Sequence, residues 1–159
     1  MHQETILSWL NDAYAMEKDS EEVLEHRLSD VADEPEIKSK IEEHLNQTRG
    51  QAERLKQRIE ALGGKISMIK SGFYNLMGFF KARSTGPFSD ESVKNGIADY
   101  TTENMEIASY EALKAGAEEI GDKETVKVIE QNLKEEQDMA NWLKSKMPMM
   151  VKNYLQTQM

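Results

Sequence analysis

Apolar residues recur every three to four positions along most of the chain, whereas strand-like alternation is absent. The spacing predicts four long helices, at about residues 4–29, 36–62, 90–120 and 123–147. Gly63 and Gly64 follow the second helix, and Pro148 marks the predicted end of the fourth. Residues 148–159 are then a short helix or a frayed end.

The connections between the predicted helices differ in length. Short turns join the first helix to the second and the third to the fourth, so each pair is predicted to form an antiparallel hairpin. The connection at 63–89 is much longer and contains an apolar block, residues 73–80, which we interpret as a short helix. It would cover a flank of the bundle or a dimer seam; a membrane-surface element is the alternative. Two hairpins joined by one long crossover predict an all-α, ferritin-like four-helix bundle that forms a single domain over residues 1–159.

Composition narrows the function classes. The chain of 159 residues has 29 acidic and 20 basic residues, a formal charge of −9, which argues against binding to nucleic acids or anionic membranes. It has no cysteine, which excludes disulfides, thiol nucleophiles and thiolate metal sites. No apolar run approaches ~18 residues, and the N-terminus lacks signal-peptide features. We therefore expect a cytoplasmic protein.

Acidic residues occupy positions where the helical pattern requires apolar ones. Glu17, Glu106 and Glu136 each lie mid-helix on or beside the inward stripe, and Glu103 lies one turn before Glu106. Ionised carboxylates are costly to bury unless they are paired or bound to a cation. Taken singly, each of these glutamates could lie on a solvated helix face, where the residue is common. Taken together, they predict an inward acidic cluster.

The second helix adds polar residues to the same layer. His44, Gln47 and Gln51 are spaced three and four positions apart, so they share one helix face. Carboxylate oxygens together with an imidazole suit Fe, Mn or Zn, and a metal is one way to make such a cluster tolerable. The alternative is that the amides are satisfied in the core, that His44 is a packed histidine, and that no metal binds.

Four segments resemble the YciE/YciF-type family of ferritin-like bacterial proteins. They are LNDAYAMEK at 10–18, HLNQTRGQ at 44–51, ENMEIASY at 103–110 and LKEE at 133–136. The resemblance extends over about residues 5–147. It implies a ferritin-like bundle that is usually dimeric, associated with bacterial stress responses and often metal-binding. By this resemblance, Glu17 and Glu106 would be the single ligands of the first and third helices, and Glu136 the ligand of the fourth.

The chain departs from the pattern of ferritin-like carboxylate proteins where further ligands are expected. Gln47 stands in place of a glutamate, and Met139 and Ala140 stand where an acid or histidine would follow on the fourth helix. Asn104 replaces an expected histidine. Loss of such ligands weakens a dinuclear site. Arg49 could instead neutralise the remaining acids and leave a buried ion network without metal.

The resulting prediction is a homodimeric, ferritin-like bacterial stress-response protein with a weak or degenerate carboxylate metal site and no catalytic role. The candidate ligands are Glu17, Glu103, Glu106 and Glu136, with Gln47 and His44 as secondary candidates. Two alternatives remain. One is a di-iron or di-manganese oxidase or peroxidase, and the other is a metal-free interaction module that uses the apolar block at 73–80.

Overall fold

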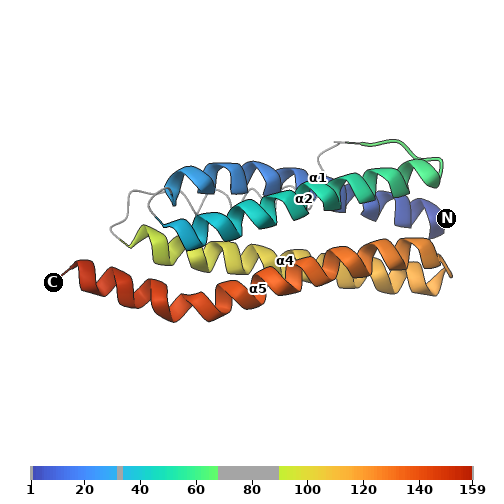
Figure 1. The fold of residues 1–159 in the computed structure, drawn as a ribbon. Helices are drawn as coiled ribbons and strands as arrows, with labels where there is room; N and C mark the ends of the chain where they lie inside the picture. The colour runs from blue at the N-terminus through green and yellow to red at the C-terminus, as the bar shows by residue number, and fades with distance from the viewer. Residues whose placement is uncertain (1, 32–33, 68–89, 159) are drawn as a thin grey trace.

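The computed structural model describes residues 2–31, 34–67 and 90–158 (Figure 1). The helices in these ranges are α1 (His2–Asp30), α2 (Pro35–Ala61), α4 (Glu91–Glu119) and α5 (Lys123–Thr157). Their positions confirm the four predicted helices, and the described ranges contain no strand. None of these helices offers an apolar stretch long enough to cross a membrane.

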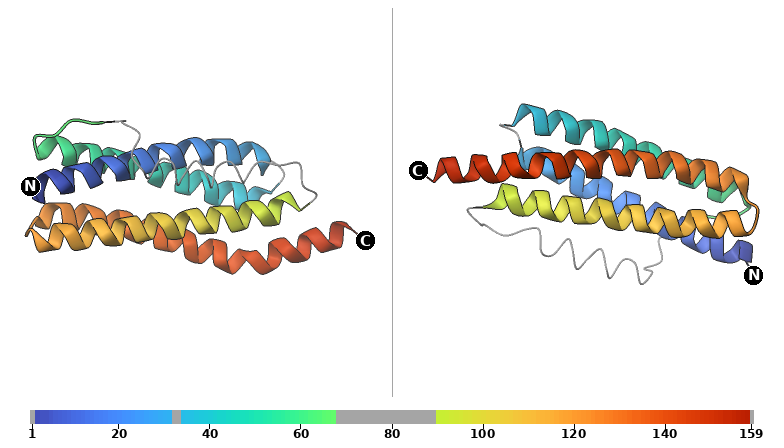
Figure 2. Two further views of the ribbon diagram at one scale, coloured as in Figure 1. Left: turned by 180° about the vertical axis from the view of Figure 1, so that it is seen from behind. Right: turned by 90° about the horizontal axis from the view of Figure 1, so that it is seen from below.

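The helices form two antiparallel hairpins that lie side by side (Figures 1 and 2). The closest packing is between α1 and α2 and between α4 and α5, while contacts of α1 with α4 and of α2 with α5 join the hairpins. α2 ends at the end of the bundle opposite the start of α4 (Figure 1), as one long crossover requires. This arrangement confirms the all-α ferritin-like bundle. The short helix predicted at 73–80 falls outside the described residues.

The turns at one end of the bundle are set by two glycines and a capping residue. Gly63 and Gly121 end α2 and α4 with φ angles of 76° and 73°, a region that glycine adopts without steric cost. Asp122 then caps α5 by accepting a hydrogen bond from the Thr125 N–H at 3.0 Å. Arg58 of α2 binds the same two residues, at 2.8 Å from Asp122 and 2.7 Å from Thr125. The end of α2 is thereby fixed against the start of α5.

The predicted end of the fourth helix at Met147 is wrong, because α5 continues through Pro148 to Thr157. A proline removes one helical hydrogen bond and crowds the preceding turn, but a helix can continue if packing holds it. Pro148 is exposed, so its distorted turn faces solvent. Two positions later, Met150 is only 6% exposed and belongs to an apolar cluster. α5 bends in its last third, and its end projects beyond the other helices (Figure 1).

The interior has two apolar clusters. The first consists of Ile6, Leu10, Ala13, Met16, Leu55, Ile59, Tyr110, Leu113, Ile129 and Leu133. The second consists of Leu24, Ile37, Ile41, Leu45 and Met150. Each helix also contains a stretch with buried polar residues: Glu17 and Ser20 on α1, His44, Thr48 and Gln51 on α2, Glu103 and Glu106 on α4, and Asn132 and Glu136 on α5. These polar stretches come together at one level of the bundle, where they form the candidate site.

Two glycines within helices, Gly50 of α2 and Gly116 in the last turn of α4, should respond oppositely to alanine. Gly50→Ala is expected to stabilise the protein by about 0.5–1 kcal/mol, because alanine favours helix and the added Cβ meets only the movable end of Arg54. Gly116→Ala is expected to destabilise it by about 1 kcal/mol, because its Cβ would lie 2.8 Å from Trp9 and 3.0 Å from the buried Ile6. Urea denaturation of both variants checks this, and equal stabilisation of the two would contradict the packing at Gly116.

Candidate metal centre

A layer of buried polar side chains separates the two apolar clusters. Its members, each no more than 4% exposed, are Glu17 of α1, His44 and Gln51 of α2, Glu103 and Glu106 of α4, and Glu136 of α5. The prediction that these acids face inward is confirmed. Carboxylates buried this deeply require protons, a cation or many hydrogen bonds. Metal binding by the cluster stays a prediction.

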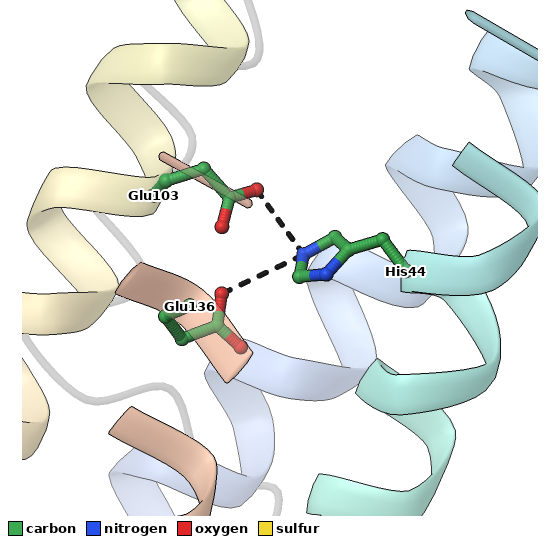
Figure 3. A group of neighbouring side chains, drawn as sticks. All are labelled: His44, Glu103 and Glu136. Atoms are coloured by element: carbon green, nitrogen blue, oxygen red, sulfur yellow. Dashed lines mark ion pairs between the residues drawn. The ribbon is translucent and has the colours of Figure 1, made fainter. Parts of the chain in front are cut away.

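The His44 imidazole points between two carboxylates of the opposite hairpin (Figure 3). Its Nε2 atom lies 3.2 Å from Glu103 Oε1 and 3.5 Å from Glu136 Oε2. One ligand atom from each of the three residues lies within 4.8 Å of the others. Ligands of a tetrahedral ion with bonds of about 2.1 Å are roughly 3.4 Å apart, and the two distances from His44 Nε2 to the carboxylates are close to that value.

Gln47, a secondary ligand candidate in the sequence, lies beside the His44 imidazole. It is half-buried, and its Oε1 lies 3.1 Å from His44 Nδ1. An amide oxygen accepts a hydrogen bond from Nδ1–H, which leaves Nε2 directed at the two carboxylates. Metal-binding histidines commonly donate their other ring N–H in this way. Gln47 therefore positions the imidazole, and it contacts His44 rather than the acids.

Two hydroxyl groups hold the remaining glutamates. The Tyr110 hydroxyl donates to Glu17 Oε1, and the Ser20 hydroxyl donates to Glu106 Oε1. Tyr110 also accepts a hydrogen bond from Asn132 Nδ2 at 3.0 Å. Burial and the nearby Glu17 carboxylate raise the pKa of Tyr110 well above its ordinary value of 10.0, so the phenol keeps its proton and remains a donor. Each of these glutamates thus has one oxygen fixed by a neutral donor.

Several buried oxygens of the layer lack a hydrogen-bond partner among the described residues. They are Glu17 Oε2, Gln51 Oε1, Glu103 Oε2 and both oxygens of Glu136. A buried acceptor without a donor costs about 1–3 kcal/mol, and more when it is charged. The concentration of such atoms at one level of the bundle is unusual for a native core. All of them are oxygen acceptors, which is the type of group that a metal cation satisfies.

The electrostatics of the layer favour neutral carboxyl groups in the absence of a cation. Burial raises the pKa of all four glutamates well above the ordinary 4.5, and it is the largest cause in each case. Neighbouring carboxylates raise these pKa values further: Glu136 acts on Glu17 and Glu106, and Glu103 acts on Glu136. A divalent ion would reverse this balance by favouring the ionised forms.

Ser20, Tyr110 and Asn132 were not identified as site residues from the sequence. Each lies three or four positions from a glutamate of the layer on its own helix, a spacing that places both on one helix face. This spacing could have placed the three residues beside the glutamates, but it could not predict their hydrogen bonds, which join different helices. Ser20 and Glu106 are 86 residues apart in the chain, and Tyr110 and Glu17 are 93 apart.

The structure also shows where Arg49, Met139 and Ala140 lie relative to the buried acids. The proposal that Arg49 neutralises the acids is wrong, because its exposed side chain binds Glu21 at 2.9 Å and Glu25 at 2.6 Å on the surface of α1. Met139 and Ala140 are buried, and they bring no ligand atom to the layer beyond a thioether. The fourth helix thus contributes Glu136 alone.

The donor set fits a divalent transition metal. An imidazole nitrogen and two carboxylate oxygens lie within 4.8 Å of one another, and Glu103 and Glu136 each have an oxygen without a hydrogen-bond partner among the described residues. Gln47 supports the imidazole from behind. One divalent ion would neutralise two carboxylates, and protons on the others would leave the layer without net charge. His44, Glu103 and Glu136 are the residues that would hold the ion.

Comparisons with known proteins agree with this architecture. Residues 1–156 match the family model described as a domain of unknown function (DUF892). A Xanthomonas campestris protein of known structure is 31% identical, with a TM-score of 0.81 over 99% of both chains. The Escherichia coli stress protein YciF is 23% identical, with a TM-score of 0.82 over 96% of this chain and 98% of that chain. A ferritin-like, diiron-carboxylate protein from Bacillus anthracis is 19% identical, with a TM-score of 0.75 over 92% and 98%. The resemblance and the fold predicted from the sequence are confirmed.

Proposed function

The chain belongs to the DUF892 family, and on that premise we propose that it is a ferritin-like stress protein that binds one divalent transition-metal ion at His44, Glu103 and Glu136. The relation to stress rests on the description of the similar Escherichia coli protein as a stress protein. The metal site rests on one observation, the convergence of His44 Nε2 on two buried carboxylates.

The orientation of His44 is the strongest support. Its Nδ1 faces an amide oxygen, so in the neutral ring the proton belongs on Nδ1 and Nε2 carries a lone pair. A lone pair 3.2 Å and 3.5 Å from carboxylate oxygens is repelled unless a cation or a proton lies between them. A metal ion would fill that position in place of the proton of a neutral carboxyl group, and Glu136 would offer it oxygens that have no other partner among the described residues.

The hydrogen bonds of Glu17 and Glu106 favour the binding of one ion over two. Glu17 and Glu106 each have one oxygen engaged by a hydroxyl donor. Met139 stands one turn after Glu136, where a second ligand of α5 would be expected. Gln47 contacts His44 and not the acids. A second ion would therefore have fewer protein ligands than the first. This favours a binding role over a catalytic one.

A dinuclear oxidase is the second candidate. The similar Bacillus anthracis protein is described as a diiron-carboxylate protein, although at 19% identity the likeness concerns the fold. In this chain, the free Oε2 of Glu17 is the feature that favours it, because a second ion would give that oxygen a partner. Metal stoichiometry separates the two candidates.

Equilibrium dialysis against Mn(II), Co(II), Zn(II) and anaerobic Fe(II), followed by elemental analysis, tests the proposal. We expect about one equivalent per chain in the wild type and less than about a tenth of that in His44→Ala and Glu136→Gln. Glu42→Gln, an exposed position on the same helix as His44, is the matched control and should bind normally. Two equivalents, both lost in Glu17→Ala, would favour the dinuclear candidate. Absence of bound metal in the folded wild type would contradict both.

A further inference from the structure

We infer that the large cavity beside the carboxylate layer is the route by which a hydrated divalent cation reaches the centre, an inference that rests on the proposed function. The cavity has a volume of about 210 Å³ and is lined by residues of all four helices. Along α4 its lining extends from Glu91 to Glu103, a rise of about 18 Å. The cavity therefore extends from the start of α4 to the level of the candidate ligands.

The inner end of the cavity reaches the centre at one candidate ligand, Glu103, whereas His44 and Glu136 do not line it. Glu103 lines the cavity, is 4% exposed, and has an Oε2 atom without a hydrogen-bond partner. Ser20 also lines it and donates to Glu106. A cation at this end would meet a buried carboxylate oxygen that has no other partner, next to the His44 imidazole.

The outer part of the lining is acidic. Asp30, Glu34 and Glu91 lie where α1 ends and where α2 and α4 begin, all at the same end of the bundle (Figure 1). Arg27 is the one basic residue among the described lining residues, and Asp99 binds it at 3.0–3.2 Å. A concave surface with this excess of acids attracts cations and raises their local concentration.

The size and the walls of the cavity suit passage. At roughly 30 Å³ per water molecule, 210 Å³ accommodates about seven waters, which is comparable to a divalent ion with six waters around it. Between the two ends the walls include Leu24, Ile41 and Leu143, which offer no ligand atoms. A hydrated ion would thus be held weakly along the way and bound at the inner end, where dehydration is compensated by His44 and the carboxylates.

The other sides of the centre are less suitable among the described residues. A second cavity of about 120 Å³ is lined by residues that include Trp9, Met16 and Leu113, and no member of the polar layer lines it. On the side of Glu17, a chain of hydrogen bonds closes the centre. The Tyr110 hydroxyl donates to Glu17 and accepts from Asn132, and the Asn132 side chain accepts from Arg54 at 2.8 Å. Arg54 also binds Glu135 at 2.5 Å, so this side of the centre is closed by a network of hydrogen bonds and an ion pair.

Filling the cavity should slow metal uptake without removing the site. Ala98 lines the cavity and is half-buried, so Ala98→Phe would place a ring in the route. Ala108→Phe, at an exposed position of the same helix, is the matched control. Stopped-flow quenching by Co(II) of the fluorescence of Trp142, which lines the cavity, measures arrival of the ion. We expect uptake to slow by about tenfold or more in Ala98→Phe, with unchanged stoichiometry and unchanged rate in Ala108→Phe.

A charge variant tests the same route without adding bulk. Glu34→Gln/Glu91→Gln removes two lining acids, while Glu42→Gln/Glu111→Gln removes two exposed acids away from the cavity. The first pair should slow uptake by roughly threefold at low ionic strength, and the difference should disappear at about 0.5 M salt. The second pair has the same net charge and should match the wild type.

The outcomes separate the two claims. If the wild type binds the metal at equilibrium but neither Ala98→Phe nor the lining-acid pair slows uptake relative to its control, the route is wrong and the site stands. If Ala98→Phe does not fold, the charge variants decide. If the folded wild type takes up no metal at equilibrium, the proposed function and the route both fail. Slowed uptake in both test variants, with controls unchanged, supports the route.

Discussion

Raising the pH from about 5 to about 8 should destabilise the metal-free protein and increase the stabilisation that added metal provides. The metal-free trend follows from the four buried glutamates, whose pKa values lie well above 4.5 in the folded state. Above pH 4.5 the unfolded chain releases these protons and the folded chain retains them, so stability falls as pH rises until the folded-state pKa values are passed. We expect a loss on the order of a few kcal/mol.

Metal binding reverses the sign. The ion binds ionised carboxylates and an unprotonated imidazole nitrogen, so its affinity increases with pH. At a free concentration of 100 to 1,000 times Kd, a ligand of the folded state adds about 3–4 kcal/mol. The Tm difference between metal-loaded and chelator-treated protein should therefore be small near pH 5 and largest near pH 8.

Thermal unfolding in matched buffers with excess Zn(II) or with a chelator measures both trends. Glu136→Gln removes one buried carboxyl group that keeps its proton in the folded state and releases it in the unfolded state. It should therefore reduce the slope of the metal-free curve, and it should abolish the metal-induced increase because it removes a ligand. Glu21 and Asp122 do not produce this trend, whereas Asp99, whose pKa is also raised, adds to it in the wild type and in Glu136→Gln alike. The pKa of Glu21 is lowered from 4.5, chiefly by a hydrogen bond from Lys18. The pKa of Asp122 is lowered from 3.8, because hydrogen bonds from Thr125 and Arg58 outweigh the opposing effect of burial. The stability that these two acids contribute is therefore lost only at lower pH. A metal-free protein whose stability rises between pH 5 and pH 8 would contradict the expectation.

Helical periodicity was sufficient to predict the fold and the inward direction of the acids. Glu17, Glu106 and Glu136 lie near the middle of long helices, where the 3.6-residue period fixes which face a side chain shares with its apolar neighbours. The same period places Ile97 and Ile120 of the third predicted helix on its inward face, and this prediction is wrong, because the two side chains are 52% and 36% exposed. Both lie toward the ends of α4, where the face that packs includes Gly96 and Ala117 instead.

Contacts between helices could not be predicted in the same way. The direction of His44 toward Glu103 and Glu136, and the support from Gln47, depend on how far each helix is rotated about its axis in the bundle. A sequence period restricts that rotation to a face, with an error of about one position. An error of one position is about 100° around a helix, which is enough to exchange a ligand for a solvated residue, as the misassigned Arg49 illustrates.

Loss of the Arg27–Asp99 ion pair should be among the most damaging changes of a charged residue outside the candidate centre. Arg27 of α1 has a side chain that is 5% exposed, and its Nε and Nη2 atoms donate to Asp99 of α4 at 3.0–3.2 Å. Asp30 contributes a longer contact of 3.4 Å. Burial raises the pKa of Asp99 in spite of the neighbouring guanidinium. The pair also links the two hairpins.

Asp99→Ala should therefore lower the free energy of unfolding by about 3 kcal/mol, because it leaves the buried Arg27 guanidinium without its principal partner. Arg27→Met/Asp99→Leu should recover most of that loss, since it removes both charges and keeps apolar volume in the cavity wall. Urea denaturation with unchanged m-values measures both. A single variant that costs less than about 1 kcal/mol would show that solvent reaches Arg27. A double variant no more stable than the single one would show that the pair contributes through packing and not through compensation of a buried charge.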